Sequence, residues 1–242
     1  MANGNLLNDG VYTYTYDAAN RLITTTQGAS TYGFRYNGLG DRLKQTANSA
    51  VTTYTLDLNA GLTQVLADGT NTYLYGLNRI GEQQPSGFAY HLPDALGSVR
   101  QLANTSASVM LARGYEPYGT TMSSAGSGSS VFQYTGELRD ASGLTFLRAR
   151  YLSTQTGRFL TRDTWPGNIQ MLGTLHPYLY ANDNPINYTD PSGHCPQGTQ
   201  RNADGTCTLT LPQVILPFGG GITIGGTVTL PDWFCPNWRV VY

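Results

Sequence analysis

The chain has 242 residues and a formal net charge of −1, and only 12% of its residues are charged. It lacks clusters of lysine and arginine interleaved with aromatic residues, which a surface that follows a phosphate backbone needs, so nucleic acid is excluded as an expected partner. The 29 glycines, 17 tyrosines and many threonines favour short strands joined by tight turns, and we predict an all-β fold with little helix.

The N-terminal stretch MANGNLLNDG has neither the basic start nor the apolar run of a signal peptide. No later segment approaches the ~18 consecutive apolar residues of a membrane span. The first residues resemble the middle of a repeat array, so we expect a chain without a targeting signal of its own and without a membrane span.

Three segments then repeat one pattern every 20 residues: YTYDAANRL (14–22), FRYNGLGDRL (34–43) and YTLDLNAGL (54–62). Each places an aromatic residue three positions before an Asx residue, in the pairs Tyr14 and Asp17, Phe34 and Asn37, and Tyr54 and Asp57. The Asx side chain can bond its own backbone and reverse the chain, while alternation puts the aromatic residues on one face. One hairpin cannot bury that face alone, so we predict hairpins stacked into a continuing sheet.

After the repeats, TTMSSAGSGSSV (120–131) predicts a flexible surface loop. In the segment that follows, Arg148, Arg150 and Arg158 nearly alternate with apolar residues, which predicts an arginine ladder on one strand face. The histidines are scattered along the chain, and packing or solvent roles are favoured for them over ligation.

Beyond Gly193 the composition changes, and threonine alternates with isoleucine, valine or leucine between glycine clusters. This pattern predicts two or three short hairpins. Residues 195–242 contain no histidine, glutamate or lysine, so we do not expect this tail to be an enzyme.

The three cysteines, Cys195, Cys207 and Cys235, lie in this tail without a C-x-x-C pair, so we expect no metal site. A bridge from Cys195 to Cys207 would close a polar loop and contribute about 3 kcal/mol in an oxidising compartment. No phosphate-binding or catalytic-triad motif is present, and we expect no cofactor.

Five motifs occur in order along the chain: DALGSVRQL, TGELRDASGL, LRARYL, GRFLTRD and YLYANDNPINYTDPSG. In them the chain resembles the RHS-repeat-associated core of Rhs and YD-repeat proteins, and the upstream units resemble their YD repeats. The resemblance implies stacked β-hairpin repeats that form part of a coiled sheet or shell, closed by the core as a plug. It divides the chain into YD repeats (1–119), the core (120–193) and a variable β-rich tail (194–242).

The resemblance also implies two aspartates that cut the chain after its final Asp-Pro-x-Gly and release a C-terminal segment, which in many members is a toxin. By position these are Asp163 and Asp190, and the cut would follow Gly193 or His194. Two carboxylates held close together share a proton, so one can act as base and the other as acid. Arg162 or Arg150 could hold the ionised partner in place.

The chain departs from the family pattern at the first aspartate, where Asp-Thr-Trp-Pro-Gly (163–167) replaces Asp-Pro-x-Gly. The two aspartates are 27 residues apart, more than is usual, and His194 stands where an apolar residue is common. Two functions therefore stay open. The chain is a shell element that encloses or presents a C-terminal segment and cuts itself, or it is a non-catalytic adhesion or assembly module.

In either function we expect a secreted or cell-surface protein. Its expected partners are its own C-terminal segment, neighbouring repeats of a longer parent, other copies, a secretion apparatus or a cell surface.

Overall fold

The computed structural model describes residues 3–165, 175–194, 199–201, 207–210 and 227–230. In this part of the chain the regular structure is antiparallel β-sheet with short 3₁₀ turns at Tyr134–Gly136 and Ala181–Asp183, and no α-helix is present. The prediction of an all-β fold with little helix is confirmed. No helix in the described residues is long and apolar enough to cross a membrane.

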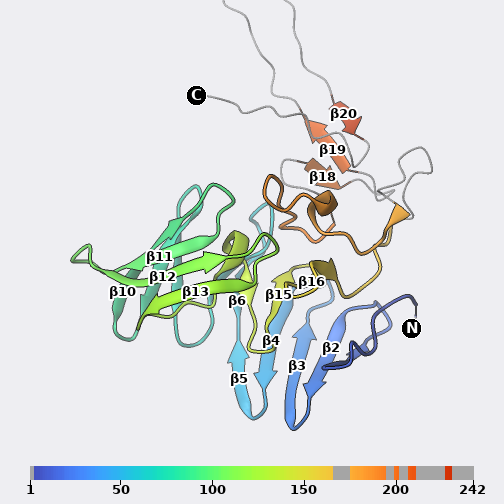
Figure 1. The fold of residues 1–242 in the computed structure, drawn as a ribbon, viewed down its shortest axis with the longest axis horizontal. Helices are drawn as coiled ribbons and strands as arrows, with labels where there is room; N and C mark the ends of the chain where they lie inside the picture. Colours follow the sequence, from blue (N-terminus) through green and yellow to red (C-terminus); the bar gives the residue numbers. More distant parts are fainter. Residues whose placement is uncertain (1–2, 166–174, 195–198, 202–206, 211–226, 231–242) are drawn as a thin grey trace, which may run out of the picture.

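Two meandering sheets are formed by the first half of the chain (Figure 1). The five-stranded sheet contains β1 (Thr13–Tyr16), β2 (Leu22–Gln27), β3 (Ser30–Tyr36), β4 (Arg42–Ala47) and β5 (Ala50–Thr53). The eight-stranded sheet contains β6 (Thr55–Asp57), β7 (Gln64–Ala67), β8 (Thr72–Tyr75), β9 (Arg79–Gln84), β10 (Gly87–Pro93), β11 (Val99–Ala103), β12 (Val109–Tyr115) and β13 (Thr121–Gly126). Within each sheet every strand pairs with the strand next to it in sequence, so both are runs of hairpins.

The 20-residue repeat corresponds to this hairpin unit. Its aromatic residues Tyr14, Phe34 and Tyr54 are all buried. The Asx residues close the turns as predicted, since Asp17 Oδ1 accepts the backbone N–H groups of residues 19 and 21, and Asn37 Oδ1 accepts those of residues 39 and 41. One sequence signal therefore sets both the reversal of the chain and the face that is buried.

The segment predicted as a flexible loop contains the strand β13, so that prediction is wrong for Thr121–Gly126. This strand pairs with β12 from Leu111↔Gly126 to Tyr115↔Thr121, and all six of its residues are exposed. A strand at the edge of a sheet needs only one hydrogen-bonding neighbour. Because none of its side chains is buried, its sequence carries no apolar alternation that would reveal it.

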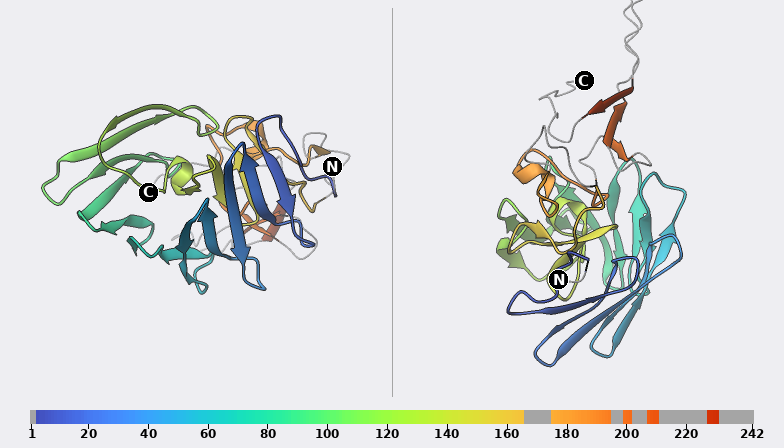
Figure 2. Two further views of the ribbon diagram at one scale, coloured as in Figure 1. Left: turned by 90° about the horizontal axis from the view of Figure 1, so that it is seen from below. Right: turned by 90° about the vertical axis from the view of Figure 1, so that its right-hand side faces the viewer.

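A four-stranded sheet of the later segment packs against the repeats: β14 (Leu138–Arg139), β15 (Leu144–Leu147), β16 (Arg150–Ser153) and β17 (Arg158–Phe159). Figure 2 shows the repeat sheets as a curved wall with this sheet against its inner side. One hydrophobic core joins the two parts, since Phe34 of β3 and Phe146 of β15 both lie 5.1 Å from the Tyr151 ring of β16.

A short sheet of the tail contains β18 (Thr199–Arg201), β19 (Cys207–Thr210) and β20 (Thr227–Leu230). The antiparallel pairing of these strands agrees with the prediction of hairpins, whereas residues 211–226, which contain the glycine clusters, lie outside the described residues. Cys207 begins β19, whereas Cys195 and Cys235 lie outside the described residues, so the bridge from Cys195 to Cys207 stays a prediction.

A buried ion pair fastens the five-stranded sheet to the later segment. Arg42 Nη1 of β4 lies 2.6 Å from Asp140 Oδ2, and each side chain is 1% exposed. The guanidinium also stacks 4.1 Å from the centre of the Phe146 ring and donates to Tyr151 Oη at 3.0 Å. A buried charge pair needs such additional partners to offset the cost of leaving water.

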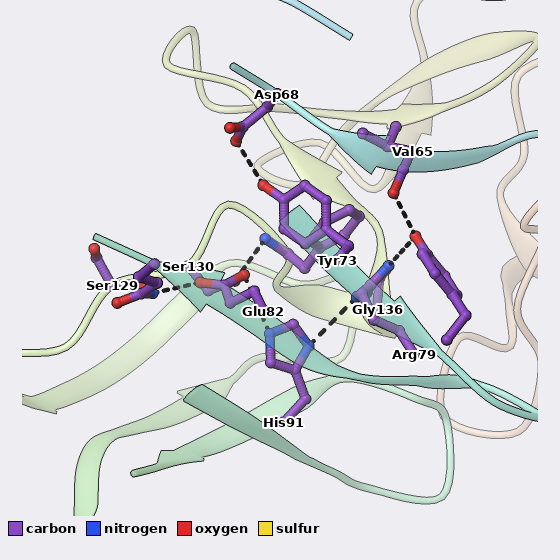
Figure 3. A network of polar contacts seen from close by, with 12 residues as sticks. Val65, Asp68, Tyr73, Arg79, Glu82, His91, Ser129, Ser130 and Gly136 are labelled. Atoms are coloured by element: carbon purple, nitrogen blue, oxygen red, sulfur yellow. Dashed lines mark hydrogen bonds and ion pairs between the residues drawn. The ribbon is translucent and has the colours of Figure 1, made fainter. Parts of the chain in front are cut away.

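A second polar junction fastens the eight-stranded sheet to the chain before β14 (Figure 3). The buried Glu82 accepts a hydrogen bond from Ser130 Oγ at 2.8 Å and faces His91 Nε2 at 3.2 Å. On the other side of the imidazole, Arg79 Nε donates to His91 Nδ1 at 3.3 Å, and Arg79 also donates to the carbonyl of Gly136. Arginine can only donate, so His91 Nδ1 must accept, and the ring proton lies on Nε2 toward Glu82.

Candidate functional site

The candidate site is centred on Arg150, the first residue of β16, which is 5% exposed. Its Nη2 lies 2.8 Å from Asp163 Oδ2 and 3.7 Å from Asp190 Oδ2. Both distances start from Arg150 Nη2. The Oδ2 atoms of Asp163 and Asp190 therefore lie no farther apart than the sum of the two distances. The guanidinium stacks 3.7 Å from the centre of the Phe159 ring, which restricts its orientation. The fold thus brings together two aspartates that are distant in sequence.

Asp163 follows β17 and is held by the backbone around it. Its N–H donates to the Pro177 carbonyl at 2.9 Å, and its Oδ1 accepts the Trp165 N–H at 3.0 Å. Arg150 Nη1 donates to the same Pro177 carbonyl at 3.3 Å. The backbone at Asp163 and the backbone at Pro177 are therefore both held at the site.

Asp190 begins the tight turn that its sequence, Asp-Pro-Ser-Gly, predicts. The Gly193 N–H donates to the Asp190 carbonyl at 3.2 Å, which closes the turn. Asp190 Oδ1 accepts hydrogen bonds from Ser192 Oγ at 3.0 Å and from the His194 N–H at 3.1 Å. The aspartate is consequently both a turn former and the neighbour of the peptide nitrogen that follows Gly193.

Gly193 lies directly on the turn between β15 and β16. Its φ of +71° is rarely adopted by other residues, and an added Cβ would overlap the Leu147 carbonyl oxygen and lie 2.9 Å from the Arg150 nitrogen.

Arg150 Nε donates to the Gly193 carbonyl. The Ala149 N–H donates to the Ser192 carbonyl at 3.2 Å, and Arg148 Nη1 donates to the Pro191 carbonyl at 2.6 Å. The turn therefore holds residues 191–193 by three contacts.

A cavity of about 870 Å³ opens beside these groups, and its walls include Arg150, Asp163, Ser192 and His194. Asp190, by contrast, is 4% exposed. Burial raises the pKa of the Asp190 carboxyl to about 6, while Arg150 and the Ser192 hydroxyl act in the opposite direction and the nearby Asp163 adds to the increase. The two carboxyls thus differ in environment, which is the usual basis for separate acid and base roles.

The structure brings together five of the six residues predicted for the cleavage site: Asp163, Asp190, Arg150, Gly193 and His194. Arg162 is exposed and lines the same cavity, but its side chain lies beside Gly4. The arginine ladder is wrong, because Arg148 lies in the two-residue turn between the paired residues Leu147 and Arg150, and Arg150 is buried on β16 whereas Arg158 is exposed on β17. That turn directs Arg148 and Arg150 to different partners.

Sequence reasoning missed two contributors to the site. Ser192 is the variable residue of the Asp-Pro-x-Gly motif, and only its hydroxyl at this position could have suggested a hydrogen bond to Asp190. The Leu147 carbonyl, which restricts position 193 to glycine, leaves no signal in the sequence. Among the described residues, no group of three or more histidine, cysteine, aspartate or glutamate side chains could hold a metal ion.

Comparison with known proteins places these features in context. The chain is 31% identical over 207 residues to the tRNA3(Ser)-specific nuclease WapA of Bacillus spizizenii, a match that covers 79% of this chain and 9% of that protein. A crystal structure of TcdB2-TccC3-Cdc42 matches with a TM-score of 0.61 and 22% identity, over 78% of this chain and 10% of that one. A Photorhabdus luminescens Tc holotoxin pore with a mutation in TccC3 matches with a TM-score of 0.54 and 17% identity, over 83% and 11%. No protein-family model matches the chain.

The hairpin sheets and the later sheet packed against them define a repeat-built β protein with the fold of the toxin structures above. More particularly, the chain belongs to the RHS/YD-repeat proteins, as its motifs indicated. It spans about a tenth of the length of the relatives that it matches.

Proposed function

We propose that this chain is part of a β-shell that encloses a C-terminal segment and cuts itself between Gly193 and His194. One observation carries the proposal: both polar atoms of this peptide bond are held by the site. Arg150 Nε donates to the Gly193 carbonyl oxygen, and the His194 nitrogen lies 3.1 Å from Asp190 Oδ1. These are the two atoms on which charge changes during peptide hydrolysis, the oxygen that becomes negative and the nitrogen that leaves.

The environments of the two aspartates favour different roles. Asp163 lines the cavity and pairs with Arg150, so it is the base that takes a proton from an incoming water. Asp190 is buried beside the leaving nitrogen and has a pKa of about 6, so it is the acid. The water oxygen bonds to the Gly193 carbonyl carbon, the C–N bond breaks, and the proton of Asp190 passes to the His194 nitrogen. The products are a carboxyl group at Gly193 and an amine at His194.

Arg150 has two tasks in this scheme. Its charge stabilises the negative oxygen that develops on the Gly193 carbonyl, and its Nη2 holds the Asp163 carboxylate. Loss of one such donor typically costs about 10²–10³ in rate.

The enclosing role rests on the curved wall of repeat sheets (Figure 2) and on the likeness to WapA and to TccC3. In this proposal the later sheet closes one end of a shell, and residues 194–242 are the enclosed segment. The protein is secreted or displayed at the cell surface and works as part of a larger parent.

A second candidate, a non-catalytic assembly module, is favoured by one observation. The edge strand β13 is fully exposed and contains no charge or proline that would prevent pairing with a strand of another chain. Concentration-dependent association that is lost when Ser124 is replaced by lysine would support this function.

Mass spectrometry of the purified chain tests self-cleavage. After incubation at pH 5.5, the proposal expects a fragment that ends at Gly193, and Asp163→Asn and Asp190→Asn each abolish it. Acid hydrolysis of the Asp190–Pro191 bond would instead give a fragment that ends at Asp190, so the masses separate the two reactions.

Asp57→Asn is the matched control, because asparagine occupies the same repeat position at Asn37 and closes the same turn. A chain that stays intact from pH 5 to 8, or that is cut equally in both site variants, would refute self-cleavage.

A further inference from the structure

The imidazole of His194 lies within the proposed cleavage site, at the first residue after the bond. Its Nδ1 is 3.9 Å from Asp163 Oδ1, and the two side chains are 22% and 17% exposed. Both line the cavity beside the site. The backbone of His194 contacts one aspartate while its side chain faces the other.

The charges around Asp163 are unevenly placed. On its Oδ2 side, Arg150 Nη2 contacts Asp163 at 2.8 Å and also reaches Asp190, so one cation serves two carboxylates. On its Oδ1 side are the neutral Trp165 N–H and the imidazole of His194. The other charged groups that line the cavity are Arg21, Asp41, Arg148 and Arg162.

We propose that His194 is a positioning residue for self-cleavage, whose protonated imidazole holds the Asp163 carboxylate charged and directed toward the Gly193–His194 bond in mildly acidic solution. This inference rests on the proposed self-cleavage. It gives a role to the residue at which the chain departs from the family pattern.

The chemistry of the pair explains why a histidine is useful here. The reaction needs a proton on Asp190 and none on Asp163, and the pKa of Asp190, about 6, makes its proton available only in mildly acidic solution. In the same solution an ordinary imidazole also becomes charged. The second cation therefore arises in the same solution in which Asp190 carries its proton.

The contact between His194 and Asp163 is lost once the chain has been cut. His194 is the first residue of the released segment, so once the bond is broken its imidazole is no longer attached to the turn that carries Asp190. An apolar residue at this position would leave Arg150 as the cation shared by both carboxylates.

The rate of self-cleavage as a function of pH tests the inference. We expect His194→Gln to cut about three- to fivefold more slowly than the original chain at pH 5, in line with the modest strength of partly exposed ion pairs. At pH 7.5, where an ordinary imidazole is largely neutral, the two rates should agree within about twofold. His194→Lys, which carries a permanent charge, should recover most of the rate at pH 5.

His176→Gln is the matched control, because His176 is exposed and contacts Arg158 rather than the site. Asp163→Asn at each pH measures any chemical hydrolysis, and thermal melting shows whether the variants fold. If the original chain is cut and the His194→Gln profile is parallel to it at every pH, the inference is wrong while self-cleavage stands. If the original chain is never cut, both are wrong.

Discussion

Replacement of Gly193 by alanine tests whether self-cleavage needs the close fit of residue 193 against the turn between β15 and β16. Gly193 has φ +71° and its added Cβ would overlap the Leu147 carbonyl, whereas Gly143 has φ +82° and the nearest atom to an added Cβ is 3.9 Å away. Alanine in this region of φ costs roughly 1–2 kcal/mol at either position. Only at position 193 must the turn also move, and a displacement of about 1 Å at a reacting bond lowers a rate about 10²-fold.

We therefore expect Gly193→Ala to reduce self-cleavage about 100-fold, and Gly143→Ala to leave the rate nearly unchanged. The fraction of cut chain is followed over time by mass spectrometry at pH 5.5, and urea denaturation gives the free energy of unfolding of each variant. Equal rates for Gly193→Ala and the original chain would refute the argument that Gly193 must sit on this turn. Equal losses in both variants would show that backbone strain alone explains the effect.

Four further predictions concern protonation and the two polar junctions. Because Asp190 must be protonated to act as acid and its pKa is about 6, self-cleavage should slow about tenfold for each pH unit above 6.5, as time courses at pH 6.5 to 8 would show. The folded-state pKa of Asp190 is raised, so its stabilising contribution is present at low pH and lost as pH rises through about 6. Between pH 4 and pH 8, urea titrations should show Asp190→Asn gaining about 2.4 kcal/mol of stability relative to the original chain. Asp140→Asn leaves the Arg42 charge buried without its partner and should cost about 3–5 kcal/mol, most of which Arg42→Met combined with Asp140→Leu restores in the same assay. Nitrogen NMR at pH 7.5 should find His91 with its proton on Nε2, and a proton on Nδ1 would contradict the contact with Arg79.

The repeat sheets could be predicted from the sequence because their signals are local. Tyr14 and Asp17 stand three residues apart, and the turn and the buried face that they specify both form within one hairpin. The all-β class follows from the same pattern. The strand β13 could not be predicted, because an exposed edge strand has no buried residues to mark it.

The candidate site was only partly predictable, since its contacts join distant segments. The positions of Asp163 and Asp190 follow from motifs, and the fold places both beside Arg150. The choice of Arg150 over Arg162 depends on tertiary structure, because Arg150 begins the buried strand β16 whereas Arg162 is exposed after β17, and sequence spacing does not record this. The contact between His194 and Asp163 likewise required coordinates.

The three contacts between the hairpin turn and residues 191–193 have a consequence for the integrity of the molecule. They secure the end of this segment without any help from the covalent bond that follows Gly193. A break at that bond would leave a carboxyl terminus that is already docked, with its last carbonyl against a guanidinium. Such a terminus would resist fraying and exopeptidase digestion, so the scaffold could survive its own scission without refolding.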